Sequence, residues 1–89
     1  MAKKYQVLQI DAWAYGDDWV YNNVIPLGKV YIEGEPSKVK ILNALRRNNY
    51  LAAGNNKDYA IDDSYIDTAT WSLVKSDDYM PLFDLVEIA

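Results

Sequence analysis

The chain has 89 residues, of which 51% are hydrophobic, 13% aromatic and 25% charged. This composition predicts a single domain over residues 1–89, because the chain is too short for two separate cores and too aromatic to be disordered. No apolar run approaches the ~18 residues that cross a bilayer, and the first residues do not resemble a secretory signal. We therefore expect no membrane association and a cytoplasmic location.

Cysteine and histidine are both absent from the sequence. The lack of cysteine excludes disulfides, thiol chemistry and cysteine-based zinc sites. The lack of histidine removes the commonest general base and the commonest transition-metal ligand. A carboxylate pair such as Asp11 and Asp84 would suit glycoside hydrolysis, but a chain of this size leaves little room for a substrate cleft. We expect that the protein is not an enzyme and holds no cofactor.

Charge is distributed unevenly along the chain. Residues 1–54 carry seven cations and five acids, whereas residues 55–89 carry two cations and eight acids. Binding to duplex nucleic acid requires a broad cationic face, which this composition does not provide. The acidic third either keeps the domain soluble or imitates nucleic-acid phosphate. Its spacing fits no EF-hand loop, so we expect no metal site among the aspartates Asp58, Asp62, Asp63, Asp67, Asp77 and Asp78.

The first half of the chain predicts two strands and a helix. Apolar residues on both faces favour a central strand over residues 5–14, and Gly16-Asp17-Asp18 predicts a turn. A second strand is predicted over 24–32, where Pro26 must lie near the strand's start or on a sheet edge. Ser37 is a good N-cap for a helix over 38–48. The apolar stripe of this helix is predicted to comprise Val39, Leu42 and Leu45, with Ile41 and Ala44 beside them.

The second half predicts a return to strands. Tyr50 and Leu51 are expected to fold back over the end of the helix, before a polar loop over 54–58. Strands are predicted over 59–62, 65–74 and 82–88, with a turn at 63–64 and a tight hairpin connection at 76–79. The predicted order is β-β-α-β-β-β, an α+β domain in which one helix covers one face of an antiparallel sheet.

The opening segment carries a resemblance to a known group of proteins. Residues 5–13, which read YQVLQIDAW, precede Gly16-Asp17-Asp18-Trp19 and Asn22. This pattern resembles a set of small uncharacterised bacteriophage and prophage proteins, most specifically at Asp11-Ala12-Trp13. The helix and the closing segment 81–85 occupy similar places, although the pattern more often has glycine at positions 14–15 and 18. The resemblance implies a phage origin and transfers no activity.

Four aromatic residues, Trp13, Tyr15, Trp19 and Tyr21, surround the first predicted turn. Trp and Tyr combine a large rigid surface with a polar tip, which suits them to anchor a binding partner. If the turn closes a hairpin, we expect the pairs 13/15 and 19/21 to stack across it. Asn22 adds an amide suited to the edge of a ligand. The alternative is that these rings fill a core that contains a single phenylalanine.

The predicted helix carries a second candidate site, formed by Lys38 and Lys40 in its first turn. Cations at the start of a helix interact unfavourably with the positive end of the helix dipole, which costs ~0.3–1 kcal/mol of helix stability. One interpretation is that they hold a phosphate or an acidic partner at the start of the helix. The alternative is an ordinary solvated face.

Together these features favour a small, non-catalytic phage protein that binds and disables a host protein, such as a defence component. Two alternatives stay open. One is a homo-oligomer that sequesters a nucleotide-like signal molecule between aromatic rings and cations. The other is a phage structural or assembly module that self-associates through a sheet edge.

Overall fold

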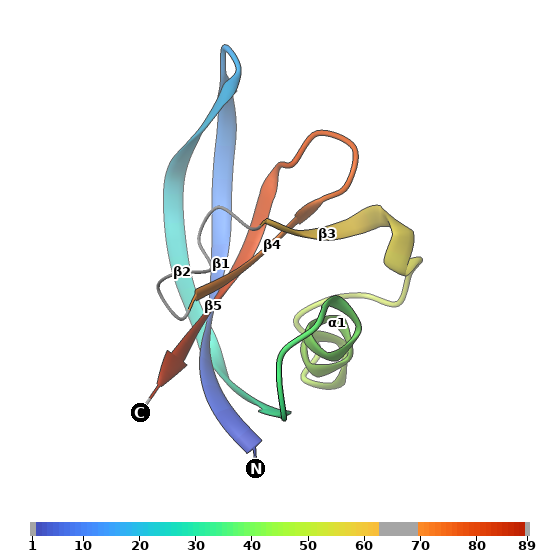
Figure 1. Cartoon of the computed structure of the whole chain (residues 1–89). Helices are drawn as coiled ribbons and strands as arrows, with labels where there is room; N and C mark the ends of the chain where they lie inside the picture. Colours follow the sequence, from blue (N-terminus) through green and yellow to red (C-terminus); the bar gives the residue numbers. More distant parts are fainter. Residues whose placement is uncertain (1, 63–69, 89) are drawn as a thin grey trace.

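The structure, a computed structural model, describes residues 2–62 and 70–88. These residues form a five-stranded antiparallel sheet, one α-helix and one short 3-10 helix (Figure 1). The α+β class, with mostly sheet, is thus confirmed. The elements in chain order are β1 (Ala2–Tyr15), β2 (Asp18–Glu33), α1 (Lys38–Arg47), η1 (Asn56–Asp58), β3 (Tyr59–Asp62), β4 (Thr70–Lys75) and β5 (Pro81–Ile88).

The strands are arranged in the order β2-β1-β5-β4-β3, and every neighbouring pair is antiparallel. β1 lies between β2 and β5, as its two apolar faces predict. β2 is an edge strand, which accommodates Pro26 beside a register shift opposite Val7 and Leu8. The predicted start of this strand at residue 24 is wrong, since β2 begins at Asp18. Backbone pairing with β1 extends the strand through residues 18–23, which do not show the apolar alternation of a half-buried strand.

The helix α1 begins where Ser37 predicts, because the Ser37 hydroxyl accepts a hydrogen bond from the backbone nitrogen of Lys40 at 3.3 Å. Its buried face is formed by Ile41, Leu42, Ala44 and Leu45. The assignment of Val39 to this face is wrong, since its side chain is 51% exposed. At about 100° per residue, Val39 falls outside the arc that those four residues span. No helix of the described residues is long and apolar enough to span a membrane.

Tyr50 and Leu51, which follow the helix in the sequence, pack against the core as expected. The Tyr50 hydroxyl donates to the carbonyl of Leu27 at 3.3 Å. The order of elements differs from the predicted one by η1, which occupies part of the expected polar loop. The Asn55 side chain caps this turn by accepting from the Lys57 nitrogen at 3.0 Å. Asn55 therefore begins a helical turn in a segment that has no apolar pattern from which the turn could be predicted.

The remaining strands follow the prediction closely where the structure describes them. β3 has the predicted bounds, and β5 begins one residue earlier than predicted. β4 ends at Lys75, one residue later than predicted, while the predicted turn at 63–64 and residues 65–69 of the predicted strand lie outside the described residues. The core between sheet and helix is formed by Tyr5, Val7, Val30, Ile32, Ile41, Leu42, Ala44, Leu45, Leu73, Phe83 and Leu85.

Candidate functional site

The β1–β2 hairpin is longer than the sheet to which it belongs. The pairs between β1 and β5 end at Gln9↔Phe83, whereas β1 and β2 remain paired as far as Tyr15↔Asp18. Residues 10–24 therefore form a two-stranded ribbon that extends past β5, and we name this ribbon the distal arm (Figure 1). Gly16 closes it with a φ of 62°, the positive value that a type II′ turn requires at its first central residue.

The register of the distal arm separates the four aromatic residues into two pairs. Trp13 lies opposite Val20, and Trp19 lies opposite Ala14. Residues opposite one another in an antiparallel pair share a face, and successive residues alternate between faces. Trp13 and Tyr15 consequently lie on one face of the arm and Trp19 on the other. The expected stacking across the hairpin is wrong, because a two-residue turn after Tyr15 pairs each tryptophan with an aliphatic residue.

Trp13 and Tyr15 form the aromatic face of the arm. Their rings pack edge to face, with centroids 5.8 Å apart and an interplanar angle of 89°. Trp13 is 48% exposed and Tyr15 is 68% exposed, so neither ring serves the core. Other large apolar residues that are exposed on the arm or at its base are Val20, Tyr21, Val24 and Ile25. The face with Trp13 and Tyr15 therefore presents a large aromatic surface to solvent.

Trp19 is half-buried, and it joins the opposite face of the arm to the turn between β4 and β5. Its indole nitrogen donates to the backbone carbonyl of Asp78 at 3.2 Å. A pocket of about 210 Å³ lies at this junction, lined in part by Trp19, Tyr21 and Tyr79. No local pattern predicts that Tyr79 belongs to this site, because its turn reaches the arm only in the folded chain.

Asn22 serves the arm itself. Its side-chain nitrogen donates to the Asp11 carboxylate at 3.1 Å, beside the register shift between Asp11 and Ala12. This hydrogen bond braces the point where the ribbon is irregular, so the Asn22 amide is directed within the arm rather than toward a ligand.

The predicted basic site lies away from the arm. Lys38 and Lys40 are in the first turn of α1, which lies toward the end of the sheet opposite the hairpin tip (Figure 1). The Lys40 ammonium donates to the carbonyls of Glu33 at 2.8 Å and Glu35 at 3.1 Å, and its backbone amide donates to Ser37. Lys40 thus fastens the connection between β2 and α1, while Lys38 is half-buried.

Charge is segregated along the molecule. The arm carries Asp11, Asp17 and Asp18 and no Lys or Arg, and the adjacent turn adds Asp77 and Asp78. The cations Lys3, Lys4, Lys29, Lys38, Lys40, Arg46 and Arg47 lie on the rest of the β1–β2 hairpin and on α1, whereas Lys57 is in η1 and Lys75 ends β4 beside the acidic turn. The arm itself is therefore uniformly acidic, and the adjacent turn has one cation next to it.

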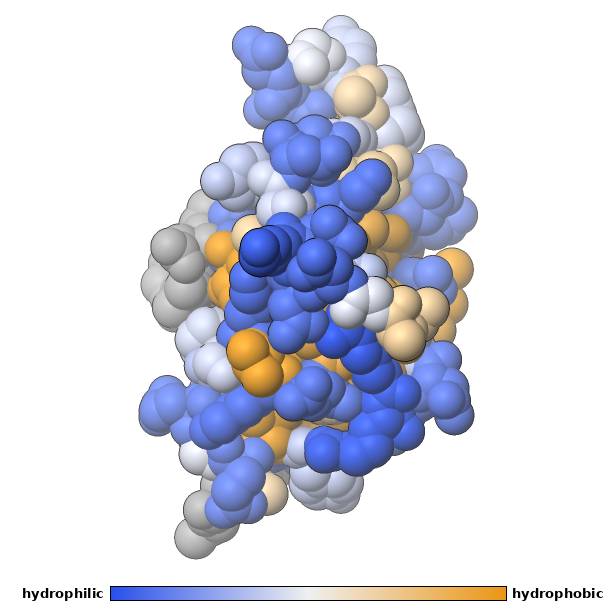
Figure 2. Space-filling view, turned by 90° about the vertical axis from the view of Figure 1, so that its right-hand side faces the viewer, coloured by the Kyte–Doolittle hydropathy of each residue, from blue (hydrophilic) through white to orange (hydrophobic). Residues whose placement is uncertain are grey.

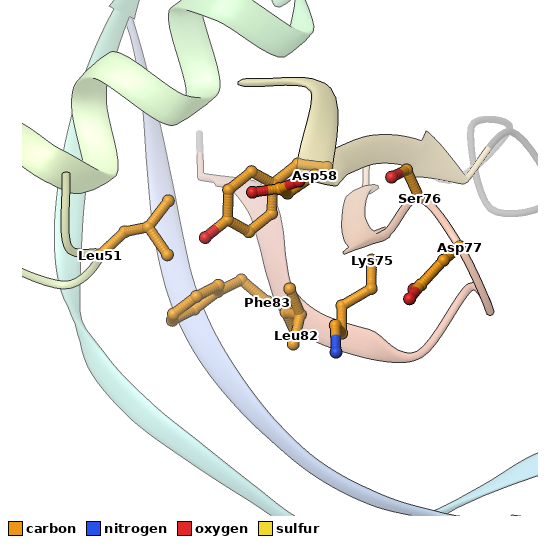
Figure 3. Close-up of a pocket in the computed structure, with 8 residues that line it drawn as sticks. Leu51, Asp58, Lys75, Ser76, Asp77, Leu82 and Phe83 are labelled. Atoms are coloured by element: carbon orange, nitrogen blue, oxygen red, sulfur yellow. The ribbon is translucent and has the colours of Figure 1, made fainter. Parts of the chain in front are cut away.

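A larger cavity, of about 530 Å³, lies on the helix side of the sheet. Figure 3 shows Leu51 and Phe83 on one side of it and Lys75 with Asp77 on the other. Asp58 adds a second carboxylate to the lining, so acidic groups outnumber the single ammonium group among the described lining residues. On the side of the molecule that carries α1 and β3, hydrophilic residues dominate the surface and hydrophobic areas form separate patches (Figure 2).

Asp84, on β5, has a raised pKa. Burial raises its pKa, the nearby negative charge of Asp62 raises it further, and the hydrogen bond donated by Ser72 at 2.7 Å partly opposes the shift. Asp84 lies opposite Leu8 in the register, three positions from Asp11 along β1, so the two carboxylates face opposite sides of the sheet. They cannot act together on one glycosidic bond.

The acidic side chains do not assemble into a metal centre in the part of the chain that the structure describes. Within residues 2–62 and 70–88, no group of three or more Asp, Glu, His or Cys side chains is arranged to hold a metal ion. Asp63 and Asp67, which belong to the acidic series of the sequence, lie outside these ranges.

Comparison with known proteins returns no relative of this chain: no family model, no curated protein and no solved structure matches it. No related protein therefore suggests a role for the distal arm, and we infer the chemistry of the arm from its own residues.

Proposed function

We propose that the protein is a non-catalytic, phage-encoded binding protein that inhibits a host protein, such as a defence component, by inserting its distal arm into that protein. It acts in the cytoplasm of the bacterial host. The phage origin rests on the sequence resemblance at Asp11-Ala12-Trp13, and the binding mode rests on the arm.

The observation that carries the proposal is the exposed pair of Trp13 and Tyr15. Tryptophan and tyrosine contribute large contact areas at low entropic cost, and they are enriched among residues that dominate binding energy. Their edge-to-face contact orders the two rings before any partner arrives. Beyond Gln9, β1 is paired with β2 alone among the described strands, so the face with Trp13 and Tyr15 is open to a cleft in a partner.

Sequestration of a nucleotide-like molecule is less well supported. The four aromatic side chains that this alternative needs around one ligand are divided between two faces of the arm. The 530 Å³ cavity has the size of a ligand site, but its lining carries more carboxylates than cations. A phosphate group would meet net negative charge there.

Assembly through a sheet edge also has little support along β2. This edge strand contains Pro26 and two register shifts relative to β1. Proline and bulges are the features by which natural sheets prevent edge-to-edge pairing.

Affinity capture from a lysate of the bacterial host tests the proposal, with the captured protein then purified and its binding measured by calorimetry. We expect Trp13→Ala/Tyr15→Ala to weaken binding by about thirtyfold or more, since truncation of a central aromatic anchor costs ~2 kcal/mol or more. The matched control is Tyr31→Ala/Val39→Ala, which removes two exposed apolar side chains outside the arm.

The control variant is expected to bind as the wild type does, and circular dichroism establishes that each variant folds. A phage that carries the arm variant should infect its host as a deletion mutant does. Equal binding by the arm variant and the wild type would show that the partner docks elsewhere.

A further inference from the structure

We propose that the pocket between the distal arm and the β4–β5 turn receives a cationic side chain of the partner, specifically an arginine. The inference rests on the proposed function, because it defines the chemistry of the surface that the arm engages. The pocket lies on the face opposite Trp13 and Tyr15, so a cleft that encloses the arm contacts both. Its lining comprises Asp17, Asp18, Trp19, Tyr21, Asp62, Ser72, Val74, Tyr79 and Pro81.

Three aromatic residues line the pocket, and two separate segments supply them. Trp19 and Tyr21 come from β2, and Tyr79 comes from the turn after β4. The hydrogen bond from Trp19 to the Asp78 carbonyl fixes these segments relative to one another. The volume of about 210 Å³ equals that of several water molecules at ~30 Å³ each, which is enough for one guanidinium group and part of its stem.

Aromatic rings together with carboxylates are surroundings that a cation prefers. The faces of Trp and Tyr rings attract cations through the ring quadrupole. Asp17, Asp18 and Asp62 contribute three carboxylates to the same lining, and no Lys or Arg is among the described lining residues. A planar guanidinium stacks on rings and donates in several directions, whereas an ammonium group is a compact, strongly hydrated charge. Arginine is therefore favoured over lysine.

The conformation of Tyr79 fits this interpretation. Its φ is 58°, a left-handed value that a bulky side chain rarely adopts and that glycine or asparagine adopts readily. The tyrosine is 58% exposed, so its ring does not compensate for this conformation by filling the core. A ring that contacts a partner's cation would explain an aromatic residue at this position.

Charge complementarity extends beyond the pocket. The arm carries no Lys or Arg, and the Trp19–Asp78 hydrogen bond holds it beside the acidic turn, where Lys75 is the neighbouring cation. A negative tip of this kind accelerates the encounter with a basic surface, such as the nucleic-acid-binding face of a host protein. The partner chemistry that fits the tip is thus a cationic segment with an exposed arginine.

Three short blocked peptides test the proposal without any knowledge of the partner. Each has the form acetyl-Gly-Xaa-Gly-amide, in which Xaa is arginine, lysine or citrulline, the neutral analogue of arginine. Binding is followed through the indole N–H signals of Trp19 and Trp13 in NMR spectra. We expect the arginine peptide to shift the Trp19 signal in a saturable manner and to leave the Trp13 signal in place. The lysine peptide should bind more weakly, and the citrulline peptide should cause no saturable shift.

Matched variants separate the pocket from general electrostatic attraction. Asp17→Asn/Asp18→Asn should weaken the arginine peptide about fivefold, since each exposed ion pair contributes ~0.2–1 kcal/mol. Asp11→Asn/Asp77→Asn removes the same charge outside the pocket and should weaken binding less than twofold. Tyr79→Asn removes the ring but tolerates the left-handed backbone, and it should weaken binding as well.

A citrulline peptide that binds as the arginine peptide does, or equal losses in the two double variants, would overturn the cation pocket. This outcome differs from failure of the proposed function. A host protein that is captured through Trp13 and Tyr15 while the arginine peptide fails to bind would refute only the pocket. If the arginine peptide binds, but the captured host protein binds the Trp13→Ala/Tyr15→Ala variant as well as the wild type, only the proposed binding mode would be refuted.

Discussion

The indole nitrogen of Trp19 donates a hydrogen bond to the backbone carbonyl of Asp78 at 3.2 Å, joining two turns that are far apart in the sequence. One partner belongs to the distal arm and the other to the connection between β4 and β5. Because β1 and β5 are paired only as far as Gln9, this hydrogen bond restrains the arm beyond the main body of the sheet.

Replacing Trp19 with phenylalanine should loosen the arm. The ring remains but its N–H donor is lost, and an exposed hydrogen bond of this kind contributes about 0.5–1 kcal/mol. We expect backbone amides of the arm to exchange with deuterium about two- to fivefold faster, with core amides unchanged. Trp13→Phe is the matched control, since no hydrogen bond of the Trp13 ring is found among the described residues. Unchanged exchange in Trp19→Phe would show that the bond does not restrain the arm.

Gly28 should not tolerate a side chain. A Cβ at this position would collide with the hydroxyl of Tyr50, which is held by its hydrogen bond to the Leu27 carbonyl. We expect Gly28→Ala to lower the free energy of unfolding by about 1–3 kcal/mol, measured by urea denaturation. Gly54→Ala, where the nearest atom would be 4.0 Å away, should change it by less than about 0.5 kcal/mol.

Removal of the Tyr50 hydroxyl tests the cause of this effect. Gly28→Ala/Tyr50→Phe should be more stable than Gly28→Ala alone, because the colliding oxygen is absent. A double variant with no recovery would assign the loss to the backbone conformation of residue 28 instead.

Arg46 and Arg47 are neighbours with different roles. The Arg46 guanidinium donates to the carbonyls of Ala52 and Gly54, both at 3.2 Å, and to the Asn56 side chain at 2.6 Å. Lysine lacks the planar guanidinium group with its several donors, so Arg46→Lys should lower the free energy of unfolding by about 1–2 kcal/mol. Arg47→Lys is the control, and we expect no measurable change. Equal denaturation midpoints for both variants would show that the hydrogen bonds of the Arg46 guanidinium group do not contribute to stability.

Asp84 should make the stability of the fold depend on pH. Burial raises its pKa above the ordinary value of 3.8, so the folded state binds a proton more tightly than the unfolded state. Its contribution is therefore favourable at low pH and is lost as the pH rises from 3.8 through the raised pKa.

Asp84→Asn removes this titration and retains an oxygen that accepts from Ser72. We expect the variant to be more stable than the wild type at pH 7, and the difference in denaturation midpoint to vanish toward pH 3. A difference that does not change with pH would contradict the assignment.

The helix illustrates what local sequence predicts well. Ser37, the apolar periodicity of residues 41–45 and the asparagines after residue 47 bound α1 to within one residue of its position in the structure. The exception, Val39, shows that an apolar residue next to a stripe need not belong to it. The succession of strands and helix along the chain was also predicted, apart from η1, because alternation and turn residues are local signals.

The candidate site was predicted in part. The sequence located aromatic residues around the first turn, but the register decided their faces, since a two-residue turn pairs Trp13 with Val20 and Trp19 with Ala14. Tyr79 was missed because contact between separate turns leaves no periodic signature. The two carbonyl partners of the Lys40 ammonium were not predicted, because they belong to the connection between β2 and α1 and are not visible in the sequence.

The elements, their order apart from η1, the lack of cysteine and histidine, and the crowding of rings near one turn can all be derived from the order of the residues. The extension of the hairpin past β5, the division of its rings between two faces, and the pocket against the β4–β5 turn become visible only in the folded chain. Burial and hydrogen bonding between distant segments depend on strand lengths and register. Those are set by the packing of the whole sheet rather than by the residues of one strand.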